Sequence, residues 1–254
     1  MVFRSSWISA FVRAGYFHFP GLVSKRTVST ARRLIDDDLA ENYDPARKAE
    51  YDSRSFCPDL LGTPDILALL HNRAVKKRIG ELVSHKTLAL DTQGQIALRR
   101  AHKVEHPSAP VAHVDGFPAP YNGVEGGEVI PFTMLVGVFL SEVKTEFAGN
   151  FTVWPGSHFL VEEYFNHRGP QSVRKGLPKL SLGKPVQLLG SPGDVVICHY
   201  ALAHAAAANV SDHDRYACFF RLWHHELYDR ANPEYRALAW THLTNIWTGW
   251  KVSP

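Results

Sequence analysis

The spacing of apolar residues changes near residue 90, from the period of a helix to that of a strand. In the first part, an apolar stripe with helical spacing follows Ser24, whose hydroxyl can cap a helix. The stripe consists of Val28, Ala31, Leu34 and Ile35. A second helix is predicted around the apolar run 66–70, and a third around Val75, Ile79 and Leu82.

From residue 95 onward, short runs rich in β-branched and aromatic residues alternate with turns that contain Pro and Gly. Seven strands are predicted here, at 95–103, 111–115, 132–140, 151–154, 185–189, 195–200 and 215–223. Short strands at this spacing are typical of a β-sandwich or β-barrel. The fold class we expect is therefore mainly β with flanking helices, in which residues 1–90 form a helical layer outside a β core.

The N-terminal segment admits two interpretations. The residues before Asp36 include six basic and no acidic side chains, which is the composition of a mitochondrial transit peptide. Alternatively, Gly15-Tyr16-Phe17 begins a short strand, and Pro20-Gly21 turns the chain into the first helix. We favour this structural interpretation and a cytoplasmic location, with mitochondrial targeting as the alternative.

Two segments with Gly and Pro are predicted to be loops. Residues 162–184 carry five basic side chains and form either a solvated loop or a lid over an anionic substrate. Residues 116–127 follow the predicted strand 111–115 directly, as an active-site loop would, and a plain surface loop fits equally well.

Length, composition and charge narrow the class of protein. A chain of 254 residues with 45% hydrophobic and 21% charged side chains is globular, and we expect one domain over residues 1–254. No apolar run reaches the roughly 18 residues of a membrane span. A net charge of +3 does not indicate nucleic-acid binding, and three scattered cysteines fit a reducing compartment. The oligomeric state is left open. The notable count is 14 histidines, a frequent metal ligand.

His113 and Asp115 stand two positions apart on a predicted strand, so both side chains point to one face and can bind one metal ion. This pair carries little weight alone, because the chain is rich in His and Asp. A second cluster strengthens it: the turn Pro192-Gly193-Asp194 precedes His204, and Arg215 opens an apolar strand eleven residues later. A buried Arg is costly unless it meets an anion. Such residues are the groups of a facial iron triad with an acid clamp.

In these residues the chain resembles the phytanoyl-CoA dioxygenase-like family of Fe(II)/2-oxoglutarate-dependent oxygenases. Four stretches that span nearly the whole chain carry the resemblance: 15–22, 113–115, 149–158 and 192–215. Its most specific parts are the turn Pro155-Gly156-Ser157-His158 and the eleven-residue interval from His204 to Arg215. The resemblance implies a double-stranded β-helix (jelly-roll) core over residues 91–254. It also implies that His113, Asp115 and His204 bind Fe(II), that Arg215 binds the distal carboxylate of 2-oxoglutarate, and that O2 is consumed.

The sequence departs from the family pattern at two places. The family commonly has a hydroxyl residue two positions after the distal His, where this chain has Ala206. The remaining hydrogen bonds to 2-oxoglutarate must then come from another residue, and Thr133 is our candidate for this role. The family's Asn-Gly before the Pro-Gly-Ser-His turn is here Gly149-Asn150, so Asn150 either contacts 2-oxoglutarate or only shapes the turn. We expect His158 to brace this turn and not to bind metal.

The resemblance implies an enzyme that oxidises an unactivated C–H bond, in the first instance by hydroxylation, and releases succinate and CO2. Asp115 argues against a halogenase, because halogenating members have a small residue there; desaturation and cyclisation stay open. Arg221 shares a predicted strand face with Arg215 and is a candidate clamp for a substrate carboxylate, with a surface or interdomain salt bridge as its alternative. Further substrate candidates are Arg99, Tyr121 and Trp154. We therefore expect a small, anionic metabolite as substrate.

Two alternatives to this function stay open. A jelly-roll metal protein without oxygenase activity, such as a cupin-type isomerase or a sensor of iron or 2-oxoglutarate, would not need Arg215 at this interval from His204. The other is a zinc site at His224, His225 and Glu226, which is disfavoured because consecutive residues at a strand end cannot all face one metal.

Overall fold

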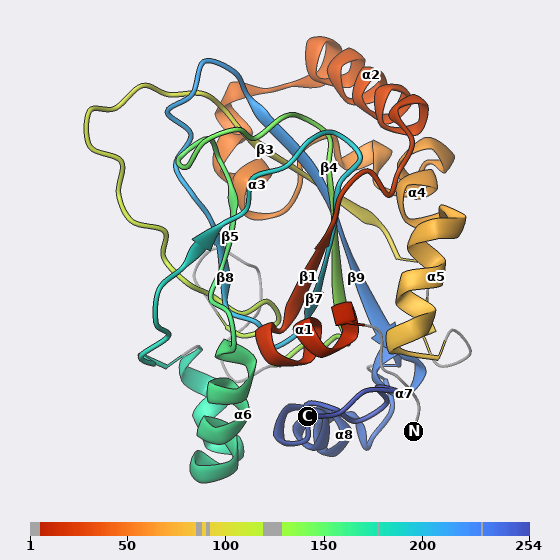
Figure 1. Ribbon diagram of the computed structural model, residues 1–254, viewed down its shortest axis with the longest axis vertical. Coiled ribbons are helices and arrows are strands. Elements are labelled where there is room, and N and C mark those ends of the chain that lie inside the picture. The colour runs from red at the N-terminus through yellow and green to blue at the C-terminus, as the bar shows by residue number, and fades with distance from the viewer. Residues whose placement is uncertain (1–5, 85–87, 90–91, 119–128, 177, 230) are drawn as a thin grey trace.

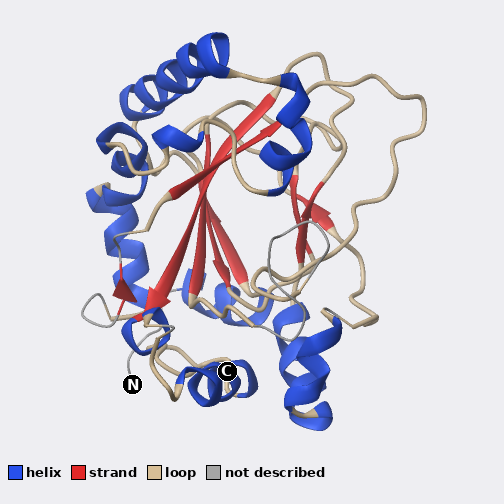
Figure 2. Cartoon of the chain, turned by 180° about the vertical axis from the view of Figure 1, so that it is seen from behind, coloured by secondary structure: helices blue, strands red, loops and turns tan. Residues whose placement is uncertain are grey.

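Two antiparallel β-sheets of unequal size form the centre of the computed structural model, which describes residues 6–84, 88–89, 92–118, 129–176, 178–229 and 231–254. Helices cover one side of the larger sheet (Figure 1). Seen from behind, the smaller sheet stands next to the larger one (Figure 2). This arrangement is the mainly β, jelly-roll architecture with flanking helices that the sequence predicts.

The larger sheet has the strand order β1-β7-β4-β9-β2, and β3 also pairs with β9. Its strands are β1 (Tyr16–Phe19), β2 (Leu88–Ala89), β3 (Gly94–Arg99), β4 (Met134–Phe139), β7 (Val195–His199) and β9 (Arg215–His224). The smaller sheet has the order β6-β5-β8, with strands β5 (Phe151–Val153), β6 (Val186–Gln187) and β8 (His204–Ala206). Because β7 and β9 belong to one sheet and β8 to the other, the chain crosses between the sheets and back over this stretch.

The helices gather mainly in the N-terminal part. They are α1 (Ser6–Ala14), α2 (Lys25–Asn42), α3 (Lys48–Ser53), α4 (Pro64–His71), α5 (Arg73–Leu82), α6 (Ser157–Arg168), α7 (His225–Tyr228) and α8 (Tyr235–Thr244). Short 3₁₀ turns lie at Pro45–Arg47, Pro58–Leu60 and Pro170–Lys175. As predicted, Ser24 caps α2: its hydroxyl accepts a hydrogen bond from the N–H of Thr27 at 3.2 Å.

Strand β9 separates two hydrophobic interiors. Its even-numbered side chains Tyr216, Cys218, Phe220 and Leu222 pack in the cluster under the N-terminal helices. Its odd-numbered side chains Ala217 and Phe219 belong to the cluster between the two sheets. This alternation follows from the two-residue period of a strand. It also turns Arg215 and Arg221 toward the space between the sheets, as the sequence predicts.

Several boundaries differ from the sequence predictions. Residues 111–115 form no regular strand, and His113 makes only an isolated bridge to His204. The first part of 162–184 is helical, because α6 continues to Arg168 and ends at Gly169. The sequence pattern did not indicate α6, since its buried side chains include the polar Ser157 and His158. The division at residue 90 is not clean either: β1 and β2 belong to the larger sheet, and α6, α7 and α8 lie beyond it.

The N-terminal segment is an integral part of the sheet, in agreement with the structural interpretation. Helix α1 buries Trp7, Phe11 and Val12, and β1 pairs with β7 from Tyr16↔Cys198 to Phe19↔Val195. In the parts of the chain that the structure describes, no helix has both the length and the apolar surface needed to cross a lipid bilayer.

Three buried imidazoles connect the β core to the N- and C-terminal segments. The Nε2 atoms of His158, His199 and His242 lie 3.1, 2.6 and 3.1 Å from the carbonyl oxygens of Val12, Ile246 and Phe132. Burial lowers the pKa of all three, to about 4 for His158 and His242. They therefore stay neutral in the folded protein near neutral pH.

We expect the free energy of unfolding to decrease as the pH falls from about 6.5 to about 4. A His in the unfolded chain is protonated below its ordinary pKa of 6.5, whereas the buried imidazoles stay neutral down to about pH 4. Protonation in this window therefore favours the unfolded chain, so the contribution of these residues to stability is complete above pH 6.5 and is lost as the pH falls through the window. Each such group contributes a slope of about 1.4 kcal/mol per pH unit. Urea titrations measure this slope. The variant His242→Gln removes one titrating group and should reduce it; an unchanged slope would contradict this explanation.

Candidate metal centre

The backbones of His113 and His204 are joined directly. The N–H of each residue donates a hydrogen bond to the carbonyl of the other, and both bonds measure 2.9 Å. The bridge attaches the segment around His113 to β8 in the smaller sheet, and it places the two ring centroids 4.5 Å apart. Two residues far apart in sequence therefore lie at a fixed separation.

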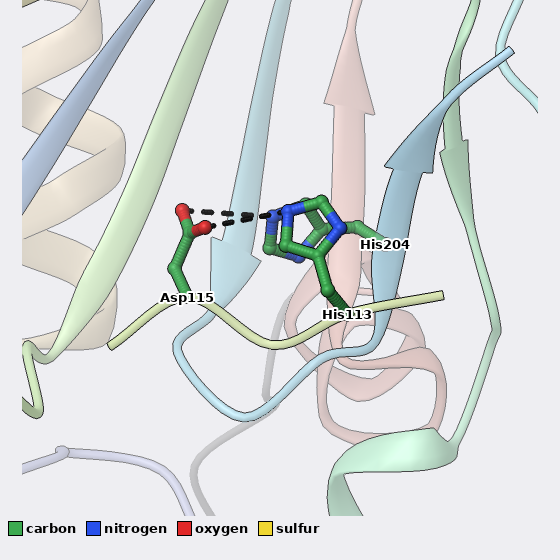
Figure 3. Close-up of side chains that lie close together, drawn as sticks. All are labelled: His113, Asp115 and His204. Atoms are coloured by element: carbon green, nitrogen blue, oxygen red, sulfur yellow. Dashed lines mark ion pairs between the residues drawn. The ribbon is translucent and has the colours of Figure 1, made fainter. Parts of the chain in front are cut away.

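Asp115 completes this group, with its carboxylate pointing at the two imidazoles (Figure 3). Its Oδ1 lies 3.4 Å from Nε2 of His113, and its Oδ2 lies 3.6 Å from Nε2 of His204. One nitrogen or oxygen atom from each residue lies within 4.8 Å of the others. Two imidazoles and one carboxylate converging on one point are the donor set of a facial triad for Fe(II).

The surroundings keep these groups in the protonation states that bind metal. Burial acts to raise the pKa of Asp115, but Arg221 and the neighbouring imidazoles outweigh it and hold this pKa well below its usual value. Burial, followed by the proximity of His204, lowers the pKa of His113. Nδ1 of His204 lies 2.9 Å from the carbonyl of Leu202. Since a carbonyl only accepts, Nδ1 carries the proton and Nε2 keeps its lone pair for a metal.

The Pro155-Gly156-Ser157-His158 turn positions the strand that carries His204. The hydroxyl of Ser157 accepts a hydrogen bond from the N–H of Ala203 at 2.8 Å, and the N–H of Trp154 donates to the carbonyl of Ala203 at 3.0 Å. Gly156 has a φ of 80°, a left-handed conformation that favours glycine. Because Ala203 directly precedes His204, this turn determines where β8 begins.

Arg215 lies in the same interior with only 3% of its surface exposed. Its Nε donates to the carbonyl of Gly149 at 2.6 Å, and its Nη1 donates to the carbonyl of Ala97 at 3.1 Å. Among the described residues, no carboxylate forms an ion pair with it. Burial, followed by the charge of Arg99, lowers its pKa to about 9, so the group remains a cation at neutral pH. Burial of a cation without an ionic partner among the described residues is costly, and a bound anion would offset this cost.

A cavity of about 720 Å³ connects the triad with Arg215. Aromatic walls come from both sheets, where the rings of Phe151 and Phe219 lie 5.1 Å apart. Ala206 also lines the cavity, and its methyl group leaves space there. The cavity is therefore shaped for a small molecule between a metal and a cation.

One protein family matches most of the chain. The match is to phytanoyl-CoA dioxygenase (PhyH) and covers residues 11–217, which include the triad and Arg215. The chain belongs to this family. The resemblance predicted from the motifs is thereby confirmed, together with the enzyme class of 2-oxoglutarate-dependent dioxygenase that it implies. No curated protein matches the chain.

Solved structures share the fold of this PhyH family member. The 2-oxoglutarate-dependent epimerase SnoN from nogalamycin biosynthesis is 18% identical with a TM-score of 0.59, covering 86% of this chain and 82% of its own. The carbocyclase SnoK from the same biosynthesis is 19% identical with a TM-score of 0.55, covering 87% and 84%. HygX from Streptomyces hygroscopicus, solved with nickel and 2-oxoglutarate, is 17% identical with a TM-score of 0.55, covering 88% of each chain. At these identities the likeness establishes the jelly-roll fold.

Two residues proposed for the 2-oxoglutarate site of this PhyH member do not line the cavity. The hydroxyl of Thr133 accepts a hydrogen bond from the N–H of His224 at 2.9 Å. The amide of Asn150 is satisfied by the backbone, with Nδ2 donating to Thr145 and Leu188 and Oδ1 accepting from Ala148. Asn150 therefore shapes the turn. The carbonyl of Gly149 next to it contacts Arg215 instead.

The substrate candidates divide into three groups. Arg99 and Arg221 line the cavity. The side chain of Trp154 packs in the core between the sheets and does not line the cavity. Tyr121, with most of the predicted loop 116–127, lies outside the described residues. The structure also brings Gln95 to the cavity wall, which the sequence analysis missed although it shares a strand face with Arg99.

From the sequence, a zinc site at His224, His225 and Glu226 is disfavoured, and His158 is not expected to bind metal. Within the described ranges, the triad is the only group of three or more His, Cys, Asp or Glu side chains close enough for one ion. His224 caps α7, and its Nδ1 lies 3.9 Å from Oε2 of Glu226 without a third ligand joining them. His158 bonds to Val12 of α1 and braces the turn.

We expect Asp115→Ala to reduce the affinity for Mn(II) by more than about 100-fold and to abolish succinate formation, because it removes one of three ligands; replacing only an outer-shell partner typically costs ~10–100-fold. Isothermal titration measures the affinity. Glu226→Ala is the matched control, since that carboxylate is exposed and outside the triad. Retained affinity in Asp115→Ala would disprove the triad assignment.

Proposed function

We propose that this chain is an Fe(II)- and 2-oxoglutarate-dependent oxygenase that hydroxylates an unactivated C–H bond of a small anionic metabolite. The observation that carries the proposal is Arg215, a buried cation that shares one cavity with the triad and pairs with no carboxylate of the described residues. A metal site alone does not require this cation. Membership of the PhyH family supports the same assignment.

The residues fit both groups. Two imidazoles and one carboxylate take three positions of an octahedral ion and leave three for other ligands. The bond from His204 to Leu202 directs its free nitrogen to this point. When bound, iron and 2-oxoglutarate would supply the O2-dependent oxidation of a C–H bond, with succinate and CO2 as co-products. The binding of nickel and 2-oxoglutarate by HygX supports this pairing.

Arg215 would orient the co-substrate. Its bonds to Gly149 and Ala97 hold the guanidinium in place and leave other donors for the distal carboxylate. Ala206 contributes no hydrogen bond here, so Arg215 carries more of this recognition than it would beside a hydroxyl residue. Phe151 and Phe219 form apolar walls that limit the entry of water.

We place an anionic group of the substrate beside Arg99. This side chain lines the cavity, and its ion pair with Asp52 is long, with Nη1 3.7 Å from Oδ1. Asp52 is also engaged by Lys48. Arg99 therefore has charge available for a ligand. HygX, a neighbour of the same fold, has been solved with hygromycin B bound, and that supports a small-molecule substrate.

We also propose that residues 1–254 act as one oxygenase domain in the cytoplasm, without nucleic-acid or membrane partners. The incorporation of α1 and β1 into the core supports this domain assignment. Desaturation and cyclisation, the family's alternatives, also begin with the breaking of a C–H bond. They differ from hydroxylation in the bond that then forms at this carbon.

Anaerobic addition of Fe(II) and 2-oxoglutarate should produce a visible charge-transfer band. We expect Arg215→Gln to need about 10- to 150-fold more 2-oxoglutarate for half of this band, because hydrogen bonds to a charged group contribute about 1.5–3 kcal/mol. The exposed Arg33 provides the control Arg33→Gln, which should titrate like the wild type. A bound metal without any band would favour the cupin-type protein without oxygenase activity.

A screen of small acids for stimulated succinate release identifies the substrate class. For an acid that stimulates release, Arg99→Met should raise its KM by about 10-fold or more, since one charge-assisted contact is lost. The concentration of 2-oxoglutarate for half-maximal rate should stay unchanged. An unchanged KM for the acid would place its anionic group elsewhere.

A further inference from the structure

Arg221 lies between the candidate metal ligand Asp115 and the wall of the cavity. We propose that Arg221 is a positioning residue that holds the Asp115 carboxylate so that only one of its oxygens faces the metal. This inference rests on the proposed function, because it requires that the triad bind a metal ion.

All three nitrogens of the Arg221 guanidinium have partners in the chain. Nε and Nη2 donate to Oδ2 of Asp115 at 2.9 and 2.5 Å, and Nη1 donates to Oε1 of Gln95 at 3.0 Å. Nε2 of Gln95 donates in turn to the carbonyl of Arg54 at 2.5 Å. This second bond fixes the orientation of the Gln95 amide, which then presents its oxygen to Arg221. The carboxylate is thus anchored through two side chains to the segment after α3.

The two oxygens of Asp115 have different surroundings. Oδ2 receives both hydrogen bonds from Arg221 and lies 3.6 Å from Nε2 of His204, whereas Oδ1 lies 3.4 Å from Nε2 of His113 and receives no hydrogen bond from Arg221. A carboxylate whose second oxygen is engaged by a guanidinium binds a metal through the first oxygen. One-oxygen binding leaves three positions open on an octahedral ion, while two-oxygen binding would fill one that 2-oxoglutarate or O2 requires.

These contacts distinguish Arg221 from the substrate clamp predicted from the sequence. To bind a substrate acid, Arg221 would have to leave Asp115, whose side chain is only 10% exposed, and a carboxylate without its partner there is costly. The ion pair is also not the surface or interdomain bridge of the alternative interpretation, because both residues line the cavity. Arg221 therefore acts through Asp115, and Arg99 remains available to the substrate.

The two effects of Arg221 on metal affinity have opposite signs. Its positive charge repels a divalent cation, so loss of this charge alone would tighten metal binding. Its hydrogen bonds order the ligand, so their loss weakens metal binding, typically by about 10- to 100-fold for such partners. A weaker affinity after removal of Arg221 therefore cannot come from relief of the repulsion between Arg221 and the metal ion.

Anaerobic titration of the full chain with Co(II), followed by calorimetry and by the visible bands of the ion, tests this proposal. Arg221→Met should bind Co(II) about 10- to 100-fold more weakly, with shifted bands. Arg221→Lys should recover part of the affinity, and Gln95→Leu should show a smaller loss. Arg99→Met removes the same charge from the same cavity without touching Asp115, and its Co(II) affinity should equal or exceed that of the wild type.

Co(II) affinity in Arg221→Met equal to or above that of the wild type, with unchanged bands, would overturn the proposal. An equal loss in Arg99→Met would also overturn it, because that variant leaves the contacts of Asp115 in place and the loss would then not depend on them. If Arg221→Met does not fold, as judged by thermal unfolding, Gln95→Leu decides: wild-type affinity and bands reject the proposal. Failure of the proposed function looks different: the wild type then binds no Co(II), or His204→Ala binds it as well as the wild type.

Discussion

Strand β9 imposes the constraint on which both interiors of the molecule depend. Its side chains alternate between an apolar face under the N-terminal helices and a face that carries Arg215, Phe219 and Arg221. Because β9 pairs with β3 on one side and β4 on the other, the same alternation passes to both neighbours. A shift of one residue in either register would move arginines into the apolar cluster. The helical layer therefore stabilises the site indirectly, since its contacts with the even-numbered residues hold the register.

The space between the sheets accommodates its cations in three different ways. Arg221 is neutralised by the carboxylate of Asp115, and Arg99 is partly compensated by Asp52. Arg215, within the described part of the chain, has only backbone carbonyls as partners. From Arg221 through Arg99 to Arg215, less of the positive charge is compensated by the chain, and more of it is available to a bound anion. Arg99 and Arg215 are register partners, so two like charges stand opposite each other on one sheet face. The fold holds this unfavourable pair in place, and an anion bound between the sheets would reduce the repulsion between the two guanidinium groups.

His113 and Asp115 belong to one short local pattern, so the sequence alone indicates that their side chains can lie together. In the structure they converge although their segment is not a regular strand: His113 is held by its bridge to His204, and a turn begins at Asp115. Thr133 illustrates why the rest of the 2-oxoglutarate site is harder to predict. The alternation of β4 is broken before its first residue, so Phe132 and Leu135 both face the cavity and Thr133 turns away. The hydrogen bonds of Arg221 to Asp115 and Gln95 join separate elements through side chains alone, and no pattern within one element indicates them.

The edge strand β1 has a consequence for the order of folding. Residues 16–19 pair with 195–198, and the carbonyl of Gly15 accepts the N–H of His199, whose ring also contacts the carbonyl of Ile246. The first and last parts of the chain therefore meet on one residue of β7. During synthesis, β1 and the N-terminal helices cannot pack on the larger sheet until most of the chain has been made, because the other strands of this sheet come later in the sequence. The larger sheet closes late, so the apolar surface of α1 lacks its partner strands for most of the synthesis of the chain.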